Sequence, residues 1–192
     1  MDLKLRDKVA LVTGSSRGLG LAIASALAEE GCRVTLCARG VDDLERAKAA
    51  VGRAAGSPSR VLSQVADMTA ADDVARVVDA TATTFGSLDI LVNNIGLARG
   101  AGIVETPDKE WQAAFDATLM PAVRASRLAV PVMRRSGGGV VLMVASIWGR
   151  ESGGRMTYNA IKAAEISLAK SMAQQLAKDN IRVVSLAPGS IL

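Results

Sequence analysis

Tyr158 and Lys162 are the residues of this chain whose types and spacing best suit proton transfer. The 192 residues include one tyrosine and no histidine, so an acid or base near neutral pH must be a carboxylate, a lysine, a cysteine or this phenol. In a helix, residues i and i+4 share one face, which would place the Lys162 ammonium beside the phenol oxygen and favour the phenolate. A tyrosine near a lysine is also common on protein surfaces, so the spacing alone does not establish catalysis.

The elements that would position this pair follow from an alternation of apolar runs with segments of helical period. Continuous Val, Leu and Ile runs are typical of strands buried on both faces, and their alternation with helices indicates βαβ units. We therefore expect an α/β protein with a doubly wound parallel sheet of six strands, a Rossmann fold. Asp67 and Thr69 fall where capping residues of the third helix belong. The expected strands are 9–13, 33–38, 61–66, 88–92, 140–146 and 181–186, and the expected helices are 19–30, 42–55, 70–85, 107–135 and 157–178.

Composition narrows the class of protein. The net charge is +4, the basic residues are scattered, and only 3% of residues are aromatic, which disfavours nucleic-acid binding. No signal peptide is visible, and the longest uncharged run near a strand, 137–149, is too short to span a membrane. Cys32 and Cys37 are expected on opposite faces of one strand, as buried thiols in a reducing compartment, with no spacing that suggests a metal site. These features predict a cytoplasmic protein that binds neither nucleic acid nor membrane.

A glycine-rich turn follows the first strand and opens the first helix. Glycines at such a turn let the backbone approach a pyrophosphate, whose charge is favoured by the free N–H groups at the helix N-terminus. The spacing Gly-x-x-x-Gly-x-Gly differs from the commoner Gly-x-Gly-x-x-Gly, and a purely structural turn is the alternative. The turn predicts a dinucleotide site formed by Gly14, Ser15, Ser16, Arg17, Gly18, Leu19 and Gly20.

The end of the second strand indicates which dinucleotide is preferred. NAD-binding folds usually place an acidic residue there for the ribose hydroxyls, whereas this strand ends in Ala38 and Arg39. Arg39 and Arg17 could clamp a 2′-phosphate, so NADP(H) is favoured over NAD(H). Alternatively both arginines are simply solvated, and the neighbouring Asp42 and Asp43 weaken the inference.

Taken together, the motifs resemble those of the short-chain dehydrogenase/reductase family, and are similar to its 3-oxoacyl-carrier-protein-reductase-like branch. The resemblance extends over nearly the whole chain. It rests on the turn at 13–20, Asp67 after the third strand, Asn93-Asn94-Ile95-Gly96 after the fourth, Ser146 at the end of the fifth, Tyr158 with Lys162, and Pro188-Gly189 after the sixth.

The resemblance implies a role for each matching residue. Tyr158 would be the general acid in carbonyl reduction, Ser146 would hydrogen-bond the substrate oxygen, and Lys162 would bind the nicotinamide ribose beside the phenol. A positioned donor and a phenolic proton would stabilise the charge that develops on the carbonyl oxygen. The remaining positions would contact the cofactor: Asp67 and Met68 the adenine, Asn93, Asn94 and Gly96 the adenosine ribose, and Pro188, Gly189 and Ile191 the nicotinamide.

The sequence departs from the family pattern in three places. Ile95 replaces the usual alanine, and Thr118 stands where the family commonly has an asparagine that anchors a water of the proton relay. Thr118 lacks the separate donor and acceptor of an amide. The chain also stops soon after the sixth strand, so residues 1–192 are expected to form one NAD(P)-binding domain without the seventh strand and substrate lid, leaving strand 181–186 as an exposed edge.

Two hypotheses about function remain. The first is an NADP(H)-dependent oxidoreductase that interconverts a small-molecule ketone and a secondary alcohol. The alternative is a catalytically silent nucleotide-binding or interaction module, favoured by Thr118 and the early end of the chain. Trp148, Arg150, Arg155 and Met156 are expected to border the substrate but do not identify it. The family resemblance further implies a homodimer or homotetramer.

Overall fold

Residues 2–189 are described by the computed structural model of the chain, and within them six strands form one parallel sheet. The strand order is β3-β2-β1-β4-β5-β6. The chain thus builds outward from β1 to β3, returns to the other side of β1, and continues to β6, which confirms the doubly wound Rossmann arrangement. The strands are β1 (Val9–Thr13), β2 (Arg33–Ala38), β3 (Val61–Val65), β4 (Ile90–Asn93), β5 (Gly139–Val144) and β6 (Ile181–Leu186).

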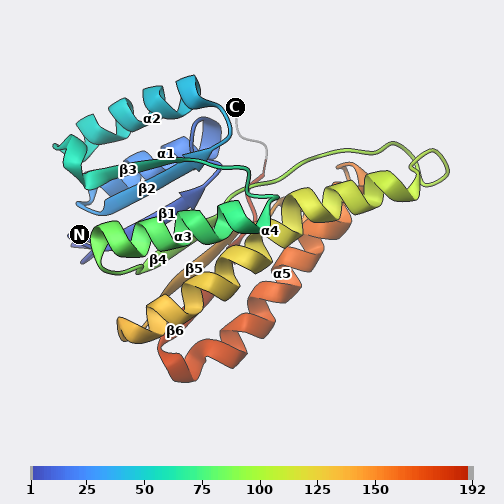
Figure 1. Cartoon of the computed structure of the whole chain (residues 1–192). Helices are drawn as coiled ribbons and strands as arrows, with labels where there is room; N and C mark the ends of the chain where they lie inside the picture. Colours follow the sequence, from blue (N-terminus) through green and yellow to red (C-terminus); the bar gives the residue numbers. More distant parts are fainter. Residues whose placement is uncertain (1, 190–192) are drawn as a thin grey trace.

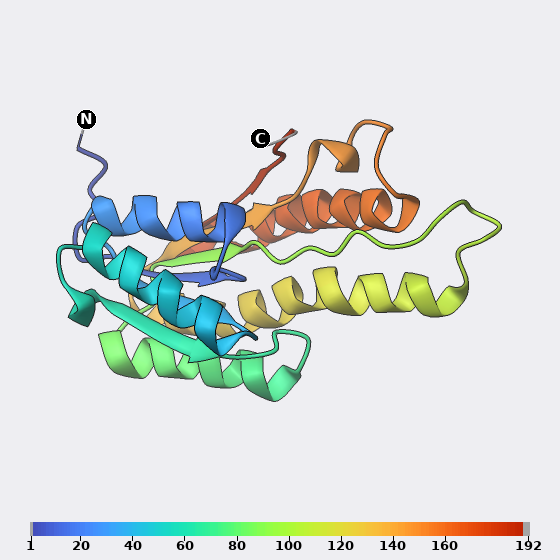
Figure 2. The same ribbon diagram turned by 90° about the horizontal axis from the view of Figure 1, so that it is seen from above.

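Helices cover both faces of the sheet (Figure 1). On one face lie α1 (Gly18–Glu29) and α2 (Val41–Ala54), and on the other α3 (Ala71–Phe85), α4 (Asp108–Arg135) and α5 (Met156–Leu176). In Figure 2, α4 and α5 extend beyond the sheet together with the segment that connects β4 to α4. Three short 3₁₀ segments complete the fold: η1 (Pro58–Arg60), η2 (Ile147–Gly149) and η3 (Ala177–Asp179).

The two faces of the sheet have separate hydrophobic cores. Leu11 of β1 packs with α3, α4 and α5, whereas its neighbour Val12 packs with α1 and α2, as the twofold alternation of a strand requires. Cys37 lies within β2, whereas Cys32 lies just before this strand and not in it as expected; the two side chains belong to cores on opposite faces of the sheet, and both thiols are free. Burial raises the pKa of Cys32 to about 11 and that of Cys37 to about 12, so neither thiol is an activated nucleophile.

Local polar contacts alter some expected boundaries. The fifth strand ends at Val144 because Ser146 caps η2, accepting a hydrogen bond from the Trp148 backbone N–H. The expected capping of the third helix is wrong. Its N-cap is Ala70, which has no side-chain cap, and Asp67 instead accepts hydrogen bonds from the backbone N–H and hydroxyl of Thr69. No helix in the described part of the chain combines the length and hydrophobicity needed to cross a bilayer.

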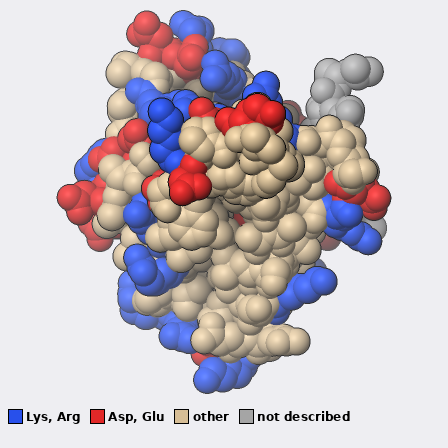
Figure 3. All heavy atoms as spheres, turned by 90° about the vertical axis from the view of Figure 1, so that its right-hand side faces the viewer, with Lys and Arg blue, Asp and Glu red and all other residues tan. Residues whose placement is uncertain are grey.

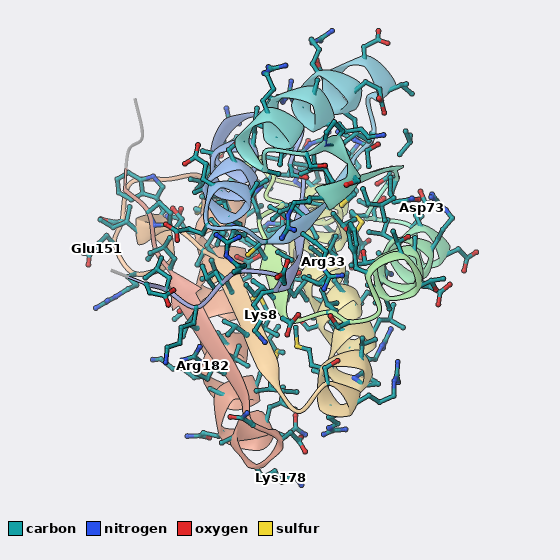
Figure 4. The ribbon with its side chains drawn as sticks, turned by 90° about the vertical axis from the view of Figure 1, so that its left-hand side faces the viewer. Lys8, Arg33, Asp73, Glu151, Lys178 and Arg182 are labelled. Atoms are coloured by element: carbon teal, nitrogen blue, oxygen red, sulfur yellow. The ribbon has the colours of Figure 1, made fainter. Side chains whose placement is uncertain are left out.

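Within the described residues, β6 is the outermost strand on one side of the sheet. It pairs with β5 on one side, and Val184 and Leu186 are 49% and 50% exposed. Figure 4 shows Lys178 and Arg182 near this edge, directed outward. Since β5 and β6 run in register over six residue pairs, the strand is nevertheless held firmly at its inner side.

Candidate active site

The carboxyl ends of β1, β4 and β5 meet where the strand order reverses, the usual ligand crevice of a doubly wound sheet. A cavity of about 440 Å³ lies there. It extends from the glycine-rich turn, past the ends of β2 and β3, to the segment that follows β4. Its lining residues are Gly14, Ser16, Arg17, Cys37, Ala38, Arg39, Gly40, Asp43, Ala66, Asp67, Met68, Thr69, Asn94, Ile95, Gly96, Leu97 and Ala117.

The glycine-rich turn makes the close backbone approach that a dinucleotide needs. Gly14 and Gly18 have φ angles of +63° and +56°, which residues with a Cβ rarely adopt. A Cβ on Gly20 would lie 2.4 Å from the Gly14 carbonyl oxygen, so glycine is required for α1 to begin against the turn. The N-cap of α1, Arg17, makes no side-chain cap, which leaves the first N–H groups of the helix available to an anion.

The side chains of three residues expected to bind the cofactor make structural contacts. The Ser15 hydroxyl is buried and accepts a hydrogen bond from the Cys37 backbone N–H, and the Leu19 side chain packs against the core under α1. The Asn93 side chain is also buried, donating to Ser126 and to the Met143 sulfur. The Asn93 side chain therefore points toward α4, and the contact of this residue with the ribose stays a prediction.

Asn94 fixes the end of β4 against the glycine-rich turn. Its backbone N–H donates to the Thr13 hydroxyl at 2.9 Å, and its amide donates to the carbonyl oxygens of Thr13 and Gly14 at 3.1 and 3.2 Å. Thr13 in turn donates to the Val92 carbonyl. These hydrogen bonds hold the ends of β1 and β4 together and so fix this wall of the cavity.

Charged residues line the end of the cavity that lies beside β2 and β3. Arg17 and Arg39 both line it and are exposed. Asp67 lines it as well, and the hydrogen bonds from Thr69, together with the nearby Arg39, lower the pKa of its carboxyl. Met68 contributes a buried wall. This end thus offers two guanidinium groups and an ionised carboxylate to a polar ligand.

The Lys162 side chain projects from α5 toward the carboxyl end of β5. Its Nζ donates to the Val144 carbonyl oxygen at 2.8 Å and lies 5.6 Å from the centroid of the Tyr158 ring. Gly96 joins this pair to the cavity, because a Cβ there would lie 3.2 Å from Nζ and 3.6 Å from the tyrosine ring. The helical spacing thus places the ammonium beside the phenol ring, next to Gly96 of the cavity lining.

Ser146 lies two residues beyond Val144, at the same strand end. It is 6% exposed, and its hydroxyl oxygen accepts from the Trp148 N–H at 3.2 Å, which leaves its proton free to donate. The Ile147 N–H donates to the Pro188 carbonyl, so the Pro-Gly turn is tied to this strand end, with Gly189 exposed beside it. Ile191, also expected to contact the nicotinamide, lies outside the described residues.

Thr118 of α4 is buried, and its hydroxyl accepts from the Leu97 backbone N–H at 3.1 Å. No hydrogen bond joins Thr118 to Lys162 in the described part of the chain. Glu165, which belongs to none of the motifs in the sequence, binds the Lys162 ammonium through its carboxylate at 2.8 Å. An acidic residue three positions after the lysine was the signal in the sequence that could have identified Glu165.

Residues 2–189 contain no cluster of three or more His, Cys, Asp or Glu able to hold a metal ion.

Comparison with known proteins places this geometry in a family. The sequence model described as short chain dehydrogenase matches residues 8–192. The chain belongs to the short-chain dehydrogenase family. This dehydrogenase is 37% identical to the 3-oxoacyl-[acyl-carrier-protein] reductase of Staphylococcus aureus strain Mu50 over 187 residues, which cover 96% of the chain and 75% of the relative.

Solved structures agree with the assignment. The L-sorbose reductase of Gluconobacter frateurii, in complex with NADPH and L-sorbose, is 41% identical with a TM-score of 0.95, over 100% of the chain and 73% of that protein. An NAD⁺-bound xylitol dehydrogenase is 32% identical with a TM-score of 0.91, over 97% of the chain and 71% of that protein. This short-chain dehydrogenase is therefore an NAD(P)-dependent oxidoreductase.

Proposed function

We propose that this dehydrogenase interconverts a ketone and a secondary alcohol with NADP(H), using Ser146, Tyr158 and Lys162. The observation that carries the proposal is that the Lys162 ammonium lies close to both the phenol ring and Gly96, which lines the cavity. A nicotinamide dinucleotide, when bound, supplies or accepts the hydride. The residues fit such a group, since Gly14, Ser16 and Arg17 line the cavity at the N-terminus of α1, whose first N–H groups have no side-chain cap.

The side chains would then divide the proton chemistry among them. Ser146 has a free hydroxyl proton with which to hold the substrate oxygen. Tyr158 would donate a proton to that oxygen in reduction and remove it in oxidation. Lys162, held on β5, would stabilise the phenolate and donate to the cofactor ribose. The cofactor contacts proposed for Ser16, Asp67, Met68, Asn94 and Gly96 are supported by their places in the cavity lining.

The preference for NADP(H) is supported by the charges at the end of β2. Arg17 and Arg39 are exposed at the cavity, and guanidinium groups bind phosphate in a bidentate manner. Asp43 also lines the cavity but pairs with Arg46, which reduces its repulsion of a phosphate. The alternative function, a nucleotide-binding module without turnover, is favoured by the engagement of Thr118 with Leu97.

We further propose that the protein is a cytoplasmic homodimer or homotetramer that pairs through α4 and α5. Trp111, Phe115 and Leu119 of α4 and Ile161 and Ala164 of α5 form an apolar groove on the outside of these helices, and Phe115 is 39% exposed. The end of the molecule at which both helices begin has a broad uncharged centre (Figure 3). The buried free cysteines suit a reducing compartment.

The proposal is tested by two measurements on the same protein, thermal melting with NADPH or NADH and nicotinamide absorbance with a panel of ketones. We expect NADPH at about 100 times its Kd to stabilise the fold by about 2.7 kcal/mol, and NADH at equal concentration to do less. Arg39→Ala should weaken NADPH about 10- to 100-fold and leave NADH unchanged, because it removes only contacts with the 2′-phosphate.

A measurement of turnover distinguishes the proposed enzyme from a nucleotide-binding module without activity. With an accepted ketone, Tyr158→Phe should lower the rate about 10²- to 10⁴-fold while the NADPH melting shift persists, because only the transferable proton is lost. NADPH binding without oxidation by any ketone would favour the module, and stabilisation by NADH alone would refute the assigned roles of Arg17 and Arg39.

A further inference from the structure

Lys162 and Glu165 form an ion pair inside the molecule, within one turn of α5. The Lys162 Nζ lies 2.8 Å from the Glu165 carboxylate, and each side chain is 2% exposed. A buried ion pair costs much of its attraction in desolvation, so it is weak support for a role in stability alone. The pair therefore calls for a role in the site that it adjoins.

The hydrogen-bond capacity of the ammonium is almost filled by two protein acceptors. It has three N–H groups, of which one donates to Val144 and one to Glu165, both at 2.8 Å. The third remains for the side on which Tyr158 and Gly96 lie. β5 and Glu165 thus fix the direction in which Lys162 presents its remaining donor.

No other charged side chain among the described residues forms an ion pair with Lys162 or Glu165. β5 and η2 carry no titratable side chain, Arg182 of β6 is exposed, and Lys178 and Asp179 of η3 lie at the far end of α5. Among the described residues, Lys162 is the ion-pair partner of Glu165, and its charge lowers the pKa of that carboxyl against the effect of burial. The charged side chains of α4 are exposed or half-buried and none pairs with Glu165: Asp108, Lys109, Glu110, Asp116, Arg124, Arg127, Arg134 and Arg135.

We propose that Glu165 is a positioning residue of the active site, which keeps Lys162 a charged ammonium fixed against β5, so that Tyr158 retains a cationic neighbour. The inference rests on the proposed function of Tyr158. Without a counter-charge, an ammonium that is almost fully buried would lose its proton more readily. Burial raises the pKa of Glu165 to about 7, with Lys162 opposing the rise, so the carboxylate is present at the alkaline pH where a phenol titrates.

Because Tyr158 is the only tyrosine, its ionisation can be measured directly through the near-ultraviolet tyrosinate absorbance of the protein without cofactor or substrate. The tryptophans do not titrate. We expect Glu165→Gln to raise the midpoint of this titration by about one pH unit, to that of the neutral double variant Lys162→Met/Glu165→Gln. Glu165→Asp, which keeps the charge, should stay nearer the wild type.

Glu151→Gln is the matched control, because Glu151 is an exposed carboxylate in the loop before α5, where Figure 4 shows it directed outward. Its midpoint should equal that of the wild type. A Glu165→Gln midpoint that is unchanged or lower would overturn the proposal. Circular dichroism at each pH checks that the variants stay folded.

A second measurement covers the case in which Glu165→Gln does not fold. Nitrogen-15 NMR of the wild-type lysine side chains should show the Lys162 ammonium still protonated throughout the Tyr158 titration, and its earlier deprotonation would refute the proposal. Failure of the proposed function would appear differently, as an absence of ketone reduction with the titration shifts intact.

Discussion

At the scale of single residues, Gly20 decides how closely α1 can approach the glycine-rich turn. An added Cβ would lie 2.4 Å from the Gly14 carbonyl oxygen and 2.5 Å from the Asn94 amide nitrogen. We expect Gly20→Ala to destabilise the fold by about 1–3 kcal/mol and to reduce the NADPH melting shift, because the turn must move. Denaturant unfolding and melting with NADPH measure the two effects.

Gly52→Ala provides the matched control for that substitution. Gly52 is also a buried helical glycine, but the nearest atom to an added Cβ is the Pro58 Cα at 3.4 Å, an ordinary contact. Helix propensity favours alanine by up to about 1 kcal/mol, so this variant should be as stable as the wild type or more stable. Equal behaviour of the two variants would contradict the assigned role of Gly20.

At the scale of elements, α5 links protonation to stability through Glu165. Its pKa is raised from an ordinary value of 4.5 to about 7, chiefly by burial. Between these values the folded state binds the proton more tightly than the unfolded state, so this contribution to stability is lost as the pH rises from about 4.5 to 7.

Glu165→Gln removes that titration. The wild-type free energy of unfolding should therefore fall relative to that of Glu165→Gln by up to about 3 kcal/mol over this pH range. Urea unfolding of both proteins at several pH values measures the difference. The lowered pKa values of Asp7, Asp67 and Asp73 act with the opposite sign at lower pH and are common to both proteins. Parallel curves for the two proteins would show that Glu165 titrates as an ordinary carboxyl.

At the scale of the whole molecule, the apolar groove over α4 and α5 is the surface that we propose for self-association. Phe115→Glu would place a charge there, and we expect it to shift the protein toward the monomer in light scattering, since burying an unpaired carboxylate is costly. Val41→Glu is the control, because Val41 is 57% exposed at the start of α2, on the opposite face of the sheet. Equal masses for both variants would exclude this groove as the interface.

The sequence by itself determined the strand and helix alternation, the family and the Tyr158–Lys162 pair, because these depend on local periodicity and on spacing within one helix. Only the tertiary structure decided where polar side chains point. In the folded chain the Asn93 side chain points toward Ser126 of α4, and the Ser15 and Thr118 hydroxyls have backbone hydrogen-bond partners. Glu165 is buried against Lys162. Such orientations depend on which neighbouring elements supply donors and acceptors, and that is fixed only when strands distant in sequence come together.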